Sequence, residues 1–201
     1  MKWFLCALCC LTEGLSVLRA QIMPDSSVQI CAYWTPGDKY AYEAREEKFK
    51  IDDRGDTTLV CRQSERRVFE ILSQTKNRYK IRLTYGDYMT TDKEDQLVHD
   101  AIVSATGPCV VEFETDETGS LLGIANLETL VAQAEASVEP AVRVMWETIP
   151  SAERKNFPKK NFRKYMARTL SDPSVVINAV NDDLGRMFFF HGARLDSTQV
   201  Y

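Results

Sequence analysis

The sequence predicts an α+β fold, in which a curved antiparallel sheet of long hairpins carries two or three helices on one face. Strand-like runs joined by short turns fill residues 34–125, and helical periodicity fills 126–184. Strands followed by helices, without regular alternation, are typical of this class. We expect one domain over 21–201 with a further strand in 186–201. An incomplete barrel-like or lipoprotein-carrier-like sheet fits the same pattern.

The strand-rich part begins with long hairpins. Turn residues at 34–38 precede an extended run over 39–51, and an Asp- and Gly-rich reversal leads into a second run over 57–73. A third strand follows at 79–85, where apolar and polar residues alternate. Both faces of the second strand carry charge, so we expect it to project into water in places. Its charged residues are Arg62, Glu65, Arg66, Arg67 and Glu70.

A short helix and a second hairpin come next. Asp92 is suited to capping a helix that ends before Gly107 and Pro108. Extended runs over 109–115 and 120–124 flank a turn in which Gly119 tolerates positive φ. The sheet therefore gains two strands.

The strongest helical pattern covers 127–149, with Asn126 as its cap and Pro140 expected to kink or split it. Further helices are predicted from Pro158 and over 174–184.

The end of the chain returns to extended structure. The apolar run 187–190 suits a buried strand, and 192–201 resembles a turn entering another strand. We expect the chain to be the first portion of a longer β-rich protein.

The N-terminus resembles an export signal. Lys2 precedes the apolar run 3–11, and the small residue Ala20 suits cleavage, so residues 1–20 are predicted to be a signal peptide. The run is shorter than the roughly 20 residues of a spanning helix, and no transmembrane segment is expected. Cys9 lacks the small preceding residue of an acylation signal, which disfavours a lipoprotein. Periplasm or cell surface is the expected location.

Composition narrows the function classes. A net charge of −4 argues against a general nucleic-acid-binding surface. Beyond the leader the chain keeps Cys31, Cys61 and Cys109, which lack metal-ligand spacing and allow at most one disulfide. Small, partly buried thiols are the simpler interpretation. No catalytic motif is present, and neither a cofactor nor a metal is expected.

A few residues can be weighed as candidate site residues. Glu112 and Glu114 fall on one face of a strand, as a glycoside hydrolase can arrange its two carboxylates, although a solvated sheet face shows the same pattern. His99 and His191 are the only histidines and lie in no motif. The tripeptide Arg54-Gly55-Asp56 matches an integrin-binding sequence, but its residues are also what a tight turn requires. The acids of that turn do not have the spacing of a calcium loop.

The helix after Pro158 is strongly basic. It suits an anionic partner such as lipid headgroups or an acidic polymer, or simply a solvated helix face. The candidate residues for such a surface are Lys159, Lys160, Arg163, Lys164 and Arg168.

The chain resembles exported proteins of unknown function from Bacteroidota. The resemblance rests on Pro36-Gly37-Asp38-Lys39-Tyr40, the strand 79–85, and Phe113-Glu114-Thr115-Asp116 with Gly119 running into Asn126-Leu127-Glu128. It implies export and a β-rich fold, and it carries over no site residue.

These observations favour a non-enzymatic binding or structural protein of the periplasm or surface. A curved sheet with helices on one face also looks like carriers that hold an apolar or lipid-like ligand between the two layers. The alternatives are a carboxylate-dependent hydrolase and an interaction module for an anionic partner. An envelope component is another conceivable partner.

Overall fold

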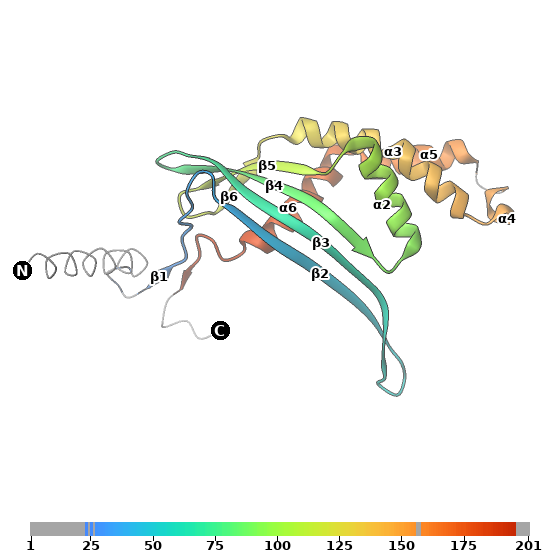
Figure 1. Ribbon diagram of the computed structural model, residues 1–201, viewed down its shortest axis with the longest axis horizontal. Helices are drawn as coiled ribbons and strands as arrows, with labels where there is room; N and C mark the ends of the chain where they lie inside the picture. The colour runs from blue at the N-terminus through green and yellow to red at the C-terminus, as the bar shows by residue number, and fades with distance from the viewer. Residues whose placement is uncertain (1–22, 24, 26, 156–157, 196–201) are drawn as a thin grey trace, which may run out of the picture.

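The computed structural model describes residues 23, 25, 27–155 and 158–195, so the predicted signal peptide and the question of lipidation lie outside the described residues. Five antiparallel strands follow one another in chain order across an open, curved sheet (Figure 1). They are β2 (Lys39–Ile51), β3 (Thr57–Gln74), β4 (Arg78–Thr90), β5 (Val110–Asp116) and β6 (Leu121–Ile124). The predicted α+β class with an antiparallel sheet is confirmed.

The β2–β3 hairpin is the longest element and extends beyond the rest of the molecule (Figure 1). Its turn is closed by Asp52, whose Oδ1 accepts hydrogen bonds from the backbone N–H of Arg54 and of Asp56, each at 2.9 Å. Gly55 adopts φ of +84°, a left-handed conformation that suits glycine. The acidic and glycine residues of this tip therefore serve the turn itself.

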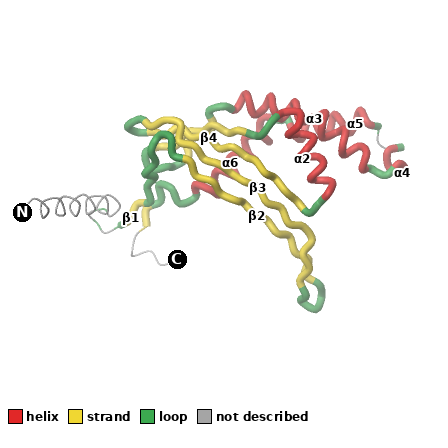
Figure 2. Tube along the Cα trace, in the orientation of Figure 1, coloured by secondary structure: helices red, strands yellow, loops and turns green. Residues whose placement is uncertain are grey.

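Helices gather on one face of the sheet and at one end of the molecule (Figure 2). Their bounds are α2 (Lys93–Thr106), α3 (Leu127–Thr148), α4 (Ser151–Arg154), α5 (Lys159–Leu170) and α6 (Pro173–Phe188). The Asp92 side chain caps α2 by accepting from Glu94 N and Asp95 N, as predicted. None of the described helices is long and apolar enough to cross a membrane.

Two expectations for α3 are corrected. The helix runs unbroken through Pro140, so this proline does not split it; packing against α2 and α5 outweighs the lost backbone bond. Asn126 precedes the helix, but its side chain makes no capping bond. It instead accepts from Glu112 N at 2.8 Å and donates to Val110 O at 2.8 Å, which ties the start of α3 to β5.

The strand predicted for 187–190, within 186–201, is wrong, because α6 continues to Phe188 and residues 189–190 lie in a turn. Leu184 and Phe188 lie one helical turn apart and are both buried in the core, whereas Phe189 and Phe190 follow the helix and are exposed. A short apolar run cannot distinguish the two structures by periodicity alone. Beyond it, β7 (Arg194–Leu195) pairs with β1 (Val28–Gln29), and 196–201 lie outside the described residues.

The main core lies between the sheet and α6. Phe113 is fully buried and meets Phe188 and Phe69 edge-on, with ring centroids 5.2 and 6.5 Å away. The β4 residues Ile81 and Leu83 are also fully buried there. A second cluster joins α3 to α5 through Val142 and Met166 and does not involve the sheet. The inner end of the helical layer is thus anchored on the strands, while the outer end packs helix on helix.

Candidate functional site

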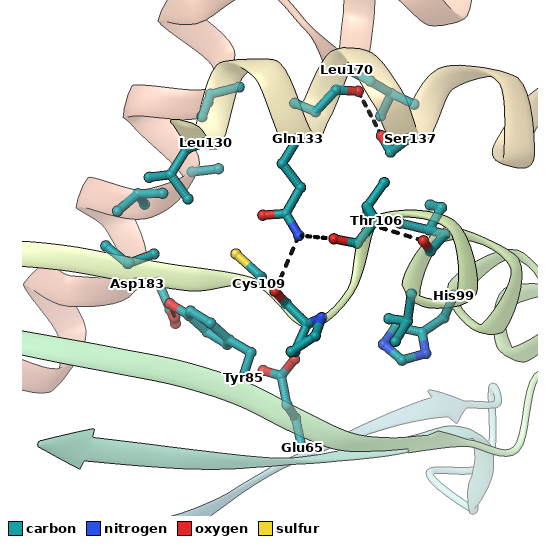
Figure 3. Close-up of a pocket in the computed structure, with 18 of the residues that line it drawn as sticks. Glu65, Tyr85, His99, Thr106, Cys109, Leu130, Gln133, Ser137, Leu170 and Asp183 are labelled. Atoms are coloured by element: carbon teal, nitrogen blue, oxygen red, sulfur yellow. Dashed lines mark hydrogen bonds between the residues drawn. The ribbon is translucent and has the colours of Figure 1, made fainter. Parts of the chain in front are cut away.

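A cavity of about 750 Å³ lies between the sheet and the helices (Figure 3). Its floor is formed by β3, β4 and the start of β5, and its walls come from α2, α3 and α6, with the end of α5 closing one side. Pockets for small molecules usually have volumes of about 300–1,000 Å³. The cavity therefore has the size of a ligand site and lies on the face that the helices cover.

Most of the lining is apolar, because each element turns its core-facing stripe toward this space. The spacing of the α3 and α6 residues follows the helical period that buries one side of each helix. Apolar lining residues include Ile102, Val103, Val111, Leu130, Val176 and Val180. Such a surface favours an apolar guest over water.

Gln133 holds two walls of the cavity together. Its Nε2 lies 3.4, 3.2 and 3.1 Å from the carbonyl oxygens of Thr106, the last residue of α2, and of Gly107 and Pro108 in the loop before β5. One amide group from α3 thereby satisfies backbone acceptors at the end of α2, where helix carbonyls lack partners within the helix. The cavity shape depends on this contact as well as on apolar packing.

One wall carries a compact polar network across β3, β4 and α6. Arg67 donates through Nε to Glu65 Oε2 at 3.2 Å and through Nη1 to Asp183 Oδ1 at 2.8 Å. The Tyr85 hydroxyl donates to Asp183 Oδ2 at 2.6 Å, and the Arg67 guanidinium lies over the Tyr85 ring, 5.4 Å from its centroid. Figure 3 shows Glu65, Tyr85 and Asp183 beside Cys109 at the sheet side of the cavity.

Burial governs the ionisation of this wall. It raises the pKa of Glu65 despite the opposing effect of Arg67, and it raises the pKa of Tyr85, to which the hydrogen bond to Asp183 adds. The pKa of the Cys109 thiol rises to about 11, through burial first and the carboxylates of Glu65 and Asp183 second. Tyr85 and Cys109 are therefore uncharged at neutral pH.

The expectation that the charged second strand projects into water in places is confirmed at Arg62 and Arg66, whose side chains are 50% and 59% exposed, but it does not hold for Glu65 and Arg67. Glu65 and Arg67 lie on the helix-covered face, defined here as the side of Tyr79, Ile81 and Leu83, where they are largely buried. Arg67 pairs with Glu65 of its own strand and with Asp183 of α6, so both contacts of this guanidinium lie on the covered side of the sheet. Sequence inspection did not single out Arg67, Tyr85 or Asp183, since the partners are separated by about a hundred positions. An arginine among the inward-facing positions of β3 was the only available signal.

Glu112 and Glu114 lie on the other side of the sheet, the open face, defined by Arg78, Lys80 and Arg82 of β4. Glu112 meets Lys80 Nζ at 2.8 Å and Arg82 Nη2 at 2.9 Å, and Glu114 meets Arg78 Nη1 at 2.9 Å. Hydrogen bonds from Lys80 and Arg82 lower the pKa of Glu112. Each carboxylate thus neutralises neighbouring cations, and the cavity lies on the opposite face.

The two histidines line different cavities. His99 lines the large cavity from α2 and stacks on Tyr88, with ring centroids 4.4 Å apart. His191 follows α6 and lies against Trp34 and Phe188, where burial lowers its pKa. It borders a smaller cavity of about 330 Å³ on the β2 side of the sheet. The Ser120 hydroxyl donates to the backbone carbonyl of His191 at 3.2 Å, and among the described residues neither imidazole forms a hydrogen bond with a serine, threonine or cysteine side chain.

The remaining candidate residues are the three cysteines and the basic residues of α5. Cys31, Cys61 and Cys109 are all free thiols of intermediate burial. No group of three metal-binding side chains occurs within the described ranges. The basic residues of α5 are exposed, and one of them, Arg163, pairs with Glu139 of α3. The remaining members of that surface are Lys159, Lys160, Lys164 and Arg168.

Comparison of the chain with protein-family models, curated proteins and solved structures found no match, so the cavity and its polar wall have to be interpreted from their own chemistry.

Proposed function

We propose that this chain is an exported, non-enzymatic binding protein that holds an apolar or lipid-like ligand between its sheet and its helices. The observation that supports this most is the cavity of about 750 Å³ with a mainly apolar lining. Burial of apolar surface stabilises a complex by about 25 cal/mol per Å² before the costs of association, which is enough to retain a chain-like molecule. Export rests on the N-terminal sequence pattern.

The cavity favours binding over the alternative of hydrolysis. The two carboxylates considered for catalysis lie on the open face, and both are engaged by cations there. Within the cavity, Tyr85 and Cys109 have raised pKa values, which disfavours their use as a nucleophile. The site therefore offers a shaped apolar space with few polar groups, as expected for a carrier.

The test is binding of a neutral apolar fluorophore, N-phenyl-1-naphthylamine, to the purified protein. Ala134 lines the cavity from α3, so Ala134→Trp should fill it and weaken fluorophore binding at least tenfold. Ala132 lies two positions away on the exposed side of the same helix, and Ala132→Trp should leave binding unchanged. Thermal melting of both variants confirms that they are folded.

Mass spectrometry of the intact protein provides a second measurement. A co-purified amphiphile that is removed by organic extraction would agree with the proposal. Failure of the wild-type chain to bind the fluorophore after extraction, or equal binding by both tryptophan variants, would contradict it.

A further inference from the structure

The polar wall of the cavity carries a net negative charge. Four carboxylates line the cavity, Glu65, Asp87, Asp182 and Asp183, against one guanidinium, Arg186. Arg66 pairs with Asp87 from outside the lining, at 3.6 Å. Asp182 and Arg186 stand one helical turn apart on α6, at an exposed position where their charges offset each other.

What remains is the largely buried group made by Glu65, Arg67 and Asp183, with two carboxylates and one guanidinium. The side chains are only 20–23% exposed, so water compensates their charges poorly. This group therefore holds one negative charge in excess next to an apolar space. A negative charge in such a place is stabilised by a cation or by hydrogen-bond donors.

Glu65 supplies the open acceptor in this group. Both oxygens of Asp183 are engaged, one by Arg67 and the other by Tyr85. Glu65 uses Oε2 to accept from Arg67, while its Oε1 has no hydrogen-bond partner among the residues that the structure describes. Figure 3 shows Glu65 extending from β3 toward the cavity, below Tyr85. Burial also raises the pKa of Glu65, against the lowering effects of Arg67 and, more weakly, of His99.

We infer that the cavity selects amphiphiles with a positively charged, hydrogen-bond-donating end, such as a long-chain primary amine, and that Glu65 accepts a hydrogen bond from that end. This rests on the proposed function and specifies its ligand class. The apolar body lies against α2, α3 and α6, and the ammonium group meets the Glu65–Asp183 side of the wall. A bound ammonium would supply the missing counter-charge, as in buried ion pairs that are fully compensated.

An anionic amphiphile of the same length lacks a matching partner. Arg67 does not line the large cavity, since its guanidinium is turned toward Glu65, Asp183 and the Tyr85 ring. Arg186 does line it, but from an exposed position beside Asp182. His99 stacks on Tyr88 and lies next to Asp100, with 3.4 Å between Nδ1 and Oδ1. A carboxylate head would therefore add to the excess negative charge.

The experiment compares dodecylamine with dodecanoate as competitors of the neutral fluorophore N-phenyl-1-naphthylamine at pH 7 and low salt. We expect the amine to displace the fluorophore at a concentration at least tenfold lower than the acid. In Glu65→Gln this preference should fall to within about threefold, with the displacement by each competitor scaled to the affinity of that variant for the neutral fluorophore. Glu70→Gln alters a carboxylate on the open face, where it pairs with Lys39 and Arg82, and should leave the preference intact.

The outcomes separate this inference from the proposed function. If the wild-type chain binds neither the fluorophore nor either amphiphile, the binding function itself is refuted. If the fluorophore binds but dodecanoate competes as well as the amine, only the ligand class is refuted. An amine preference that persists in Glu65→Gln would overturn the role of Glu65. The wild-type comparison needs no variant, so the ligand class can be tested even if Glu65→Gln does not fold.

Discussion

The two faces of the same five-stranded sheet handle charge in opposite ways. On the open face, Lys39, Glu70, Arg82 and Glu112 form a ladder of ion pairs in which successive contacts measure 3.1, 3.6 and 2.9 Å. On the helix-covered face the strands present buried apolar residues, and a largely buried charged network forms around Arg67.

This difference between the faces indicates which face stabilises the fold and which face could hold a ligand. Exposed ion pairs contribute at most about 1 kcal/mol each, because water already solvates both partners. They do keep the uncovered side of a long sheet polar, which opposes association with other sheets. Burial on the other face stabilises the fold, and the same face leaves the space for a ligand. The open face keeps the uncovered side of the sheet polar, and the covered face leaves the cavity in which we propose that a ligand binds.

The largest expected effect is on the covered face. Phe113→Ala removes a fully buried ring that contacts Phe69 and Phe188, and it should lower the free energy of unfolding by about 3–5 kcal/mol. Its neighbour in β5, Glu114, points to the open face, and Glu114→Gln should change the free energy of unfolding by less than about 1 kcal/mol. Urea denaturation of both variants measures the difference. Equal losses would contradict the contrast between the faces.

An intermediate effect is expected within the polar network. Tyr85→Phe removes the hydroxyl that donates to Asp183 and leaves a largely buried carboxylate oxygen without that donor, at a cost of about 1–2 kcal/mol. In the matched control Tyr40→Phe, the lost hydroxyl donates to Asp38 at an exposed turn, where water replaces it. Thermal and urea unfolding report both changes. If Tyr85→Phe is as mild as the control, the network is not shielded from water.

The smallest effect is a difference in titration between the faces. Relative to the ordinary value of 4.5, the pKa of Glu112 is lowered by Lys80 and Arg82, and that of Glu65 is raised by burial. The contribution of Glu112 to stability is therefore present above pH 4.5 and lost as the pH falls through its folded pKa. For Glu65 the sign reverses, so its contribution is present below pH 4.5 and lost as the pH rises through its folded pKa.

Carboxyl carbon NMR of the folded protein, assigned with Glu65→Gln and Glu112→Gln, measures both pKa values directly. With glutamine standing in for the protonated side chain, both variants should approach wild type at low pH and differ from it in opposite directions as the pH rises, Glu112→Gln becoming less stable than wild type and Glu65→Gln more stable. Two glutamates that titrate together would show that the faces do not differ electrostatically.

Much of the architecture follows from local patterns. The alternation of Tyr79, Ile81, Leu83 and Tyr85 with polar residues defines the two faces of β4, because side chains along a strand point to opposite sides in turn. Asp92 predicts the start of α2, since its carboxylate can accept hydrogen bonds from the unpaired N–H groups of the first turn. Such features depend on neighbours in the chain and can be inferred without the fold.

The errors arise where tertiary contacts override a local pattern. Asn126 has the chemistry of a cap, but β5 lies within reach and offers its side chain two backbone partners. The apolar run after Gly185 starts as the last turn of α6, because Phe188 packs among the rings of Phe69 and Phe113. Those partners come from distant strands, and their position is set only when the sheet has formed.

The sequence by itself determined the class of the fold, the alternating faces of its central strands and the polar turn at the hairpin tip, since period, capping and turn chemistry act over a few residues. Only the tertiary structure decided the cavity and its polar wall. Glu65, Tyr85 and Asp183 belong to β3, β4 and α6. They meet because α6, the last helix in chain order, packs back against the sheet. No local periodicity encodes that return, because it depends on the summed packing of residues far apart in the chain.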